Sequence, residues 1–173
     1  MEPYARPAPE ATPPSVGAPA PRLLCDHMLI RLGRWLRAAG LDTAIAGPGR
    51  ADGELLREAL SERRLLVTRD RRLLEFRGAF GVVVLLRANG VAACAAELTA
   101  RLGVDWLHRP FSRCLECNGP LAPAPGERVA QVPPESGGAD VYHCAGCDRI
   151  YWAGSHVRRM QATLDAWASS DFR

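Results

Sequence analysis

The sequence predicts an α/β fold in which helices cover a short parallel sheet, followed by a small cysteine-containing module. Two observations favour this fold. Between residues 23 and 102, short apolar runs alternate with amphipathic segments of helical period, and the last third of the chain carries two C-x-x-C pairs. A chain of 173 residues is long enough for one ordinary domain and a small second unit.

The short apolar runs are predicted strands, because turn residues bound them and they are rich in aliphatic side chains. They span residues 23–25, 43–46, 65–68 and 82–86. Helices are predicted at residues 28–39, 52–63 and 91–102, and a helical turn at 71–76. Strands that alternate with helices favour right-handed βαβ units and a parallel sheet.

The helical period also predicts which side chains form the core. In the first helix the expected buried face consists of Met28, Leu29, Leu32, Trp35, Leu36 and Ala39. In the second helix it consists of Leu55, Leu56, Ala59 and Leu60. Arg31, Arg34 and Arg37 recur every three residues, and we expect them opposite most of the first apolar set, with their charges exposed.

Composition divides the chain into segments. Residues 1–22 hold seven of the 14 prolines and show no periodicity, which predicts a disordered tail. We expect the α/β domain at 23–103, a linker at 104–113, the cysteine module with a C-terminal helix at 114–165, and a tail at 166–173. No apolar run is long enough to span a membrane and no signal pattern opens the chain, which predicts a cytoplasmic protein.

The basic residues are unusual in kind. All 22 are arginine, and the chain contains no lysine. This excludes sites built on a phosphate-loop lysine, a Schiff-base lysine or a kinase-type lysine.

Four cysteines have the spacing of a zinc site. Cys114 and Cys117 form one C-x-x-C pair, and Cys144 and Cys147 form the other after 26 intervening residues. Each pair can present two thiolates to a tetrahedral zinc ion, and four thiolates leave no open position, so one structural zinc is predicted. The alternative is two unrelated reduced pairs or a redox site.

Three acids are expected at one edge of the sheet. Asp26 follows the first strand, Asp52 opens the second helix and Asp70 follows the third strand. In a parallel sheet of strand order 2-1-3-4, Asp26 and Asp70 flank the point where strand order reverses, which is where such sheets place active sites. Carboxylates gathered there suit Mg²⁺ or Mn²⁺, although each acid taken alone can also be read as a helix cap.

Basic and aromatic residues near these positions are candidate RNA contacts. Aromatic rings stack on bases and arginines bind phosphates, although Tyr151 and Trp152 can equally be read as packing the cysteine module onto the first domain. The candidates are Arg31, Arg34, Arg37, Arg69, Arg71, Trp152, His156, Arg158 and Arg159.

Several segments resemble one family. CDHMLIRLGRWLRAAGLDTA, TRDRRLL, RCLECNGPL and CAGCDRIYWAGSHVRRM, which start at Cys25, Thr68, Arg113 and Cys144, closely resemble the Mut-seven-C RNase domain. The resemblance covers roughly residues 23 to 165 and is most specific at the cysteine end. It implies a PIN-like three-layer α/β/α domain joined to a zinc ribbon, a divalent-metal-dependent ribonuclease activity, and structured RNA as the partner.

The resemblance also assigns residues. Asp26, Asp52 and Asp70 match the acids of the family by position, and the four cysteines match its ribbon ligands. Larger PIN nucleases supply a further acid for which this chain shows no clear equivalent, because Asp42 starts a strand and so belongs to the other edge of the sheet. The alternative to a ribonuclease is therefore a non-catalytic RNA-binding or ribosome-associated module. A phosphatase or phospho-receiver is disfavoured by the absence of lysine and of an acid at residue 28.

Overall fold

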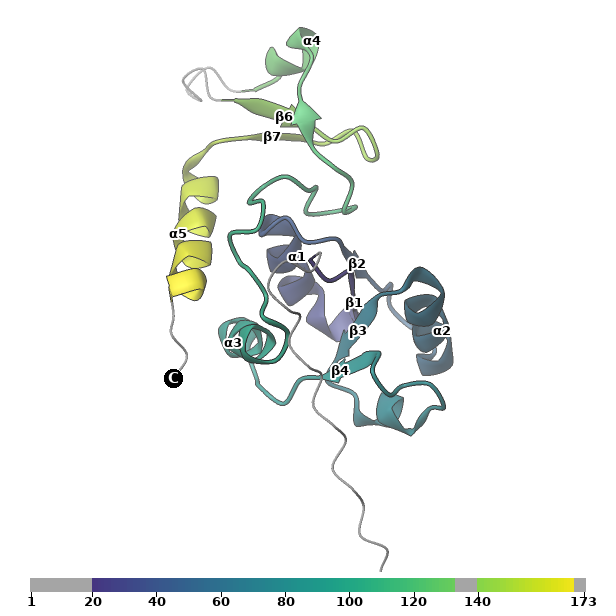
Figure 1. The fold of residues 1–173 in the computed structure, drawn as a ribbon. Coiled ribbons are helices and arrows are strands. Elements are labelled where there is room, and N and C mark those ends of the chain that lie inside the picture. Colours follow the sequence, from purple (N-terminus) through teal and green to yellow (C-terminus); the bar gives the residue numbers. More distant parts are fainter. Residues whose placement is uncertain (1–19, 133–139, 170–173) are drawn as a thin grey trace, which may run out of the picture.

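A four-stranded parallel sheet forms the centre of the main domain (Figure 1). The computed structural model describes residues 20–132 and 140–169, so most of the expected N-terminal tail lies outside the described residues. The strands are β1 (Leu23–Cys25), β2 (Thr43–Ile45), β3 (Leu65–Thr68) and β4 (Val83–Leu85), in the order β2-β1-β3-β4. The α/β fold class with a parallel sheet is confirmed.

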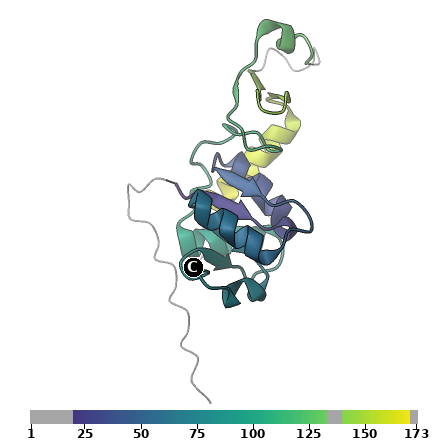
Figure 2. The same ribbon diagram turned by 90° about the vertical axis from the view of Figure 1, so that its right-hand side faces the viewer.

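Alternation along β1 divides the core into two layers. Leu23 and Cys25 point to one face of the sheet, where α1 (Ile30–Ala38) and α3 (Val91–Leu102) pack. Leu24 points to the other face, against α2 (Asp52–Glu62) and the 3-10 helix η2 (Arg71–Glu75). Helices therefore cover both faces in three layers, and α2 lies in front of the sheet in Figure 2.

Two predicted core positions are wrong. The segment before α1 is a 3-10 turn, η1 (His27–Leu29), so the helical phase starts later than expected and Met28 is 56% exposed. Leu60 lies near the end of α2, beside Gly78, and is 46% exposed. Leu29, Leu32, Leu36, Leu55, Leu56 and Ala59 are buried as expected.

Arg37 is also misplaced by the sequence pattern. Residues three apart in a helix are turned by about 60° from one another, because each residue advances about 100°. Six residues therefore separate Arg31 from Arg37 by about 120°. Arg31 and Arg34 are exposed, whereas Arg37 is only 5% exposed and turns into the protein.

The segment expected as a linker at 104–113 is packed against the main domain. Trp106 is buried, and the N–H groups of Arg109 and Phe111 donate to the carbonyls of Ala39 and Ala38 at the end of α1. Gly40 has a φ of +89°, and a side chain there would collide with the backbone carbonyl of Arg109. Residues 104–113 therefore satisfy the open carbonyl end of α1.

The cysteine module lies beside the end of the sheet domain that carries α1 and β2 (Figure 1). Its sheet consists of β5 (Ala122–Pro123), β6 (Val141–His143) and β7 (Ile150–Trp152), all antiparallel, with a short α4 (Gly126–Val129) after β5. We call this sheet and its two cysteine pairs the ribbon.

The last helix, α5 (Ser155–Ser169), returns from the ribbon to the main domain and packs against α3. It includes residues 166–169, which we expected in a tail, because Trp167 is buried in the core. Its ring lies edge-on to Trp35 and Trp106, with centroids 5.0 Å and 4.8 Å away. Within the described ranges, no helix is long and apolar enough to cross a membrane.

The tryptophan cluster should therefore stabilise the fold. We expect Trp167→Ala to lower the free energy of unfolding by about 3–5 kcal/mol, because it removes a large buried ring that two other rings contact. Urea denaturation measures this change. Leu107→Ala, at a side chain that is 41% exposed, is the control and should change the free energy by less than about 0.5 kcal/mol. Equal effects would contradict the role of the cluster.

Candidate functional site

The two C-x-x-C pairs adopt the same local structure. In each pair the N–H of the first cysteine donates to a carbonyl five residues on, at Gly119 and at Arg149. Its own carbonyl accepts from Asn118 or Asp148, both of which have positive φ. Asn and Asp tolerate this left-handed conformation better than other non-glycine residues. The sequences CLECNG and CAGCDR therefore fold into two matching knuckles.

These knuckles bring the four sulfur atoms together. The Sγ atoms of Cys114, Cys117, Cys144 and Cys147 all lie within 4.8 Å of one another, with Cys114–Cys147 at 3.5 Å and Cys117–Cys144 at 3.4 Å. A tetrahedral zinc with Zn–S bonds of about 2.3 Å needs its sulfur atoms about 3.8 Å apart. The cluster can therefore hold a structural metal such as zinc.

The surroundings of Cys114 favour its thiolate. The Tyr151 hydroxyl lies 3.1 Å from its sulfur atom. Burial opposes ionisation, but this hydroxyl and the backbone N–H groups of Cys117 and Glu116 outweigh burial and lower the pKa of Cys114 to about 6. Desolvation and the adjacent Cys114 and Cys117 thiols instead raise the pKa of Cys147 to about 12. Four ionised thiols therefore need a cation between them.

Arg37 fastens the first knuckle to the main domain. Its Nη1 donates to the carbonyls of Leu115 and Glu116 at 2.9 Å and 2.7 Å, and its Nε donates to the carbonyl of Thr43 at 2.7 Å. Arg34, one turn earlier, reaches the same knuckle from solvent through an ion pair with the Glu116 carboxylate at 2.8 Å. Arg37 was expected to be an exposed RNA contact. It is instead buried and donates to carbonyls of the protein, so it is no longer a candidate RNA contact.

Asn118 forms a second connection to the main domain. Its amide accepts from the N–H of Thr43 at 3.0 Å and donates to the carboxylate of Asp42 at 2.7 Å. Arg64 and Arg22 also bind Asp42. Burial opposes ionisation of Asp42, but these three partners outweigh it and hold its pKa well below the usual range. Asp42 is therefore a structural acid at the amino edge of the sheet, on the side expected from the sequence.

The opposite edge of the sheet carries Asp26 and Asp70. The two residues follow the neighbouring strands β1 and β3, between which strand order reverses. The buried Thr68 links them, because its hydroxyl donates to Asp26 Oδ2 at 2.7 Å and accepts from the N–H of Asp70 at 3.0 Å. Asp70 also caps η2 by accepting from the N–H of Arg72 at 2.9 Å. The position of both acids follows directly from strand order.

Asp52 lies on a third element, the helix α2. It is the first residue of α2 and half-buried, and Ala51 occupies the capping position. Across the described residues, the four cysteines are the group of three or more metal-binding side chains close enough to share an ion, and the three acids do not form such a group. The three acids therefore lie on the elements predicted from the sequence, but their carboxylate oxygens do not form one close group.

The remaining candidate RNA contacts fall into two groups. Arg31, Arg34, Arg69, Arg71, His156, Arg158 and Arg159 are exposed. Trp152 is half-buried and lies edge-on to His156, with ring centroids 6.2 Å apart. Arg69 donates to the side-chain oxygen of Asn89 at 3.2 Å.

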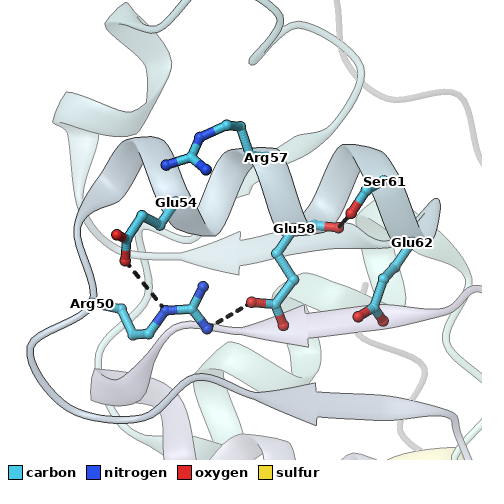
Figure 3. A pocket seen from close by; sticks show the side chains of 6 residues that line it. All are labelled: Arg50, Glu54, Arg57, Glu58, Ser61 and Glu62. Atoms are coloured by element: carbon cyan, nitrogen blue, oxygen red, sulfur yellow. Dashed lines mark hydrogen bonds and ion pairs between the residues drawn. The ribbon is translucent and has the colours of Figure 1, made fainter.

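A shallow pocket lies on the outer face of α2 (Figure 3). Arg50 sits between two acids there, 2.7 Å from Glu58 and 3.6 Å from Glu54, and Arg57, Ser61 and Glu62 complete the lining. Its third acid, Glu62, is paired with Arg64 at 2.6 Å, and the pocket lies on the side of α2 away from the sheet. It adds no chemistry to the acids at the sheet edge.

Three functional positions are not predicted by the sequence pattern. Thr68 opens the TRDRRLL segment, in which the sequence assigns a role only to Asp70. In the structure its hydroxyl binds the Asp26 carboxylate. Asn118 directly follows Cys117, the second cysteine of its pair. An asparagine at that place is the sequence signal that could have indicated a left-handed turn. Tyr151 is expected to stack on an RNA base or to pack the cysteine module onto the first domain. Its hydroxyl instead contacts the sulfur atom of Cys114.

Together these features define an α/β protein with a four-cysteine ribbon. Its acids Asp26 and Asp70 lie at the switch point of the parallel sheet, which is the point where strand order reverses. A family model described as Mut7-C RNAse domain matches residues 21–164, and the chain therefore belongs to that family. The resemblance inferred from the sequence is confirmed. Comparisons with curated proteins and with solved structures gave no match.

The cysteine cluster should bind one zinc ion per chain. We expect Cys144→Ser to lose the ion and to unfold at lower temperature, because metal binding to such a site contributes folding free energy. Elemental analysis with a thermal melt measures both. Cys94→Ala changes a cysteine outside the cluster and should keep a full complement of zinc. Purified wild-type protein that folds stably without metal would contradict the prediction.

Arg37 and Arg34 form a matched pair for testing the docking of the ribbon. Arg37→Met should lower the free energy of unfolding by about 2–4 kcal/mol, because three carbonyls lose their donor. Arg34→Met removes only an exposed ion pair and should cost about 0–1 kcal/mol. Urea denaturation compares the two variants. Similar losses would show that Arg37 is no more important than a surface charge.

Proposed function

We propose that the protein is a divalent-metal-dependent endoribonuclease whose site is formed by Asp26, Asp52 and Asp70. The observation that carries the proposal is the pair Asp26 and Asp70 at the switch point, held together by Thr68. Membership of an RNase domain family supports RNA as the substrate and a nuclease as the class of enzyme.

The donor set at this edge suits a hard cation. Asp26 and Asp70 would hold Mg²⁺ or Mn²⁺, with Asp52 as the third acid, and such ions keep several waters and take up substrate phosphate oxygens. When bound, the ion would supply a water of lowered pKa and neutralise charge on the phosphodiester. With Asp26 and Asp70 as its protein ligands, the ion would not require direct contact with Asp52.

The residues of the chain have distinct roles in this proposal. The Thr68 hydroxyl donates to Oδ2 of Asp26 and so fixes the orientation of its carboxylate. The backbone N–H of Asp70 donates to the Thr68 hydroxyl, and its carboxylate accepts from the N–H of Arg72 at the start of η2. These two hydrogen bonds fix the position of Asp70. Both acids therefore face substrate from backbone positions that the sheet fixes, which is the preorganisation that phosphodiester cleavage needs.

We assign RNA positioning to the exposed basic residues. Arg31 and Arg34 on α1, Arg69 and Arg71 beside Asp70, and the group Trp152, His156, Arg158 and Arg159 on the ribbon side would hold a structured RNA by its phosphates and by stacking. The ribbon would act through its zinc as a rigid support and take no part in the chemistry. A cytoplasmic location is consistent with the cysteine chemistry and stays a prediction.

The second candidate is an RNA-binding or ribosome-associated module without catalysis. The observation that favours it is that, in the described part of the chain, the three acids do not gather within reach of one ion. It retains the basic surface and the ribbon and predicts RNA binding that does not depend on Asp26 or Asp70.

An RNA cleavage assay separates the two candidates. With Mn²⁺ or Mg²⁺ we expect wild-type protein to cut RNA and an Asp26→Asn, Asp70→Asn variant to lose at least about 100-fold in rate, since both proposed ion ligands are neutralised. Asp105→Asn, at an exposed acid away from the sheet edge, is the control and should cleave normally.

The outcomes of the assay are distinct. Equal cleavage by wild type and the double variant would point to a contaminating nuclease and reject the site. RNA binding by all three proteins with no cleavage by any would favour the non-catalytic module.

A further inference from the structure

An exposed apolar surface lies directly after Asp70. The segment from η2 to β4 turns back on itself through hydrogen bonds from Ala79 to Phe76 and from Val82 to Ala79. Leu73 anchors it in the core below α2, while Phe80 is 73% exposed and Phe76 is 40% exposed. Two phenyl rings that stay partly or largely exposed on one short segment form an apolar surface of the kind that a partner covers. We call residues 69–80 the η2 surface.

This surface is also basic. Arg69, Arg71, Arg72 and Arg77 are all exposed, against the two carboxylates Asp70 and Glu75. Arginines on the same segment as exposed aromatic rings suit a partner with flat apolar faces and negative charge, which is the chemistry of an unpaired nucleic-acid strand. An apolar protein surface would gain nothing from four exposed guanidinium groups.

The η2 surface lies between two of the proposed acids. Asp70 is part of it, and Phe76 leans against the first turn of α2, because a methyl group added at Gly53 would lie 3.4 Å from Phe76 Cε1. Gly53 directly follows Asp52. At the other end of α2, Gly78 lies beside Leu60 in the same way, 3.6 Å from Cδ1. The phenyl ring of Phe76 is therefore close to the elements that carry Asp52 and Asp70.

The neighbouring face of α2 offers a polyanion less attraction. Glu54 and Glu58 are paired with Arg50, and Glu62 is paired with Arg64, so the pocket of Figure 3 carries little net charge. On the η2 surface, four exposed arginines stand against two carboxylates. The charge pattern thus favours the approach of a nucleic-acid strand along the η2 surface.

We propose that the η2 surface binds an unpaired RNA segment, with bases stacked on Phe76 and Phe80 and phosphates held by Arg71, Arg72 and Arg77. This inference rests on the proposed function and narrows it, because the bond presented to the acids lies in a single-stranded part of the RNA. Bases of a duplex face one another inside the helix and are not open to stacking on a phenyl ring. A folded RNA would therefore be cut at a loop or an end.

Binding measurements without added Mg²⁺ or Mn²⁺ test this surface independently of cleavage. Fluorescence anisotropy compares a short unstructured RNA with an RNA duplex of the same sequence. We expect Phe80→Leu and Phe76→Leu each to weaken binding of the unstructured RNA at least about 5-fold, since a base stack contributes about 1–3 kcal/mol. Binding of the duplex should be unchanged, and Phe80→Trp should retain binding of the unstructured RNA.

Arginine variants test the phosphate contacts. Arg71→Gln with Arg72→Gln should weaken binding and reduce the salt dependence of log Kd by about 1.4, because each of the two lost phosphate contacts in a single strand contributes about 0.7. Arg57→Gln, on the outer face of α2, is the matched control and should change neither quantity. Far-ultraviolet circular dichroism checks that every variant is folded.

Each outcome decides the inference. Normal binding by the leucine variants, equal loss for duplex and single strand, or no RNA binding by the wild type would overturn it. A surface that docks a protein would tolerate leucine in place of phenylalanine. Loss of single-strand binding in a protein that cleaves nothing would support the η2 surface and reject the proposed nuclease, whereas cleavage that needs Asp26 but neither phenyl ring would do the reverse.

Discussion

The buried guanidinium of Arg37 is the contact on which the arrangement of the two parts depends. It belongs to α1, and it donates to β2 through Thr43 and to the first cysteine knuckle through Leu115 and Glu116. A buried charge without partners costs several kcal/mol, so Arg37 is compatible with the fold only when the knuckle is in place. The knuckle in turn needs Cys114 and Cys117 held at one point. Folding of the main domain and closure of the cysteine cluster are therefore coupled.

The acids at the two edges of the parallel sheet lie in different surroundings. At the amino edge, Asp42 is satisfied by Arg22, Arg64 and Asn118, and this polar cluster joins the start of β2 to β3 and to the ribbon. At the carboxyl edge, Asp26 and Asp70 are linked by Thr68 and are half-buried. An acid whose hydrogen bonds are all used by protein groups stabilises structure, whereas an acid with free oxygen lone pairs can bind a cation. The order of strands and helices along the chain is thus enough to separate Asp42 from the candidate site.

Periodicity predicted the layers well and the surroundings of single side chains less well. Short apolar runs and helical spacing located every strand and helix of the main domain, because burial on both sheet faces leaves a strong pattern. Met28 and Arg37 were misplaced because the 3-10 turn before α1 and the 60° drift of a three-residue spacing shift side chains around the helix. Thr68 and Asn118 act through contacts with residues that are 42 and 76 positions away in sequence, and no local pattern records such contacts.

The absence of lysine makes the count of arginines a poor measure of RNA-binding surface. Arg37, Arg64 and Arg101 donate to backbone carbonyls of Leu115, Leu23 and Leu85, a use that suits the five fixed donors of a guanidinium. Arg34, Arg50 and Arg128 are paired with surface acids. What distinguishes Arg71, Arg72 and Arg77 is their setting, since they are exposed beside two phenyl rings and next to Asp70. Substrate contact is therefore better inferred from which arginines the fold already uses than from how many the sequence contains.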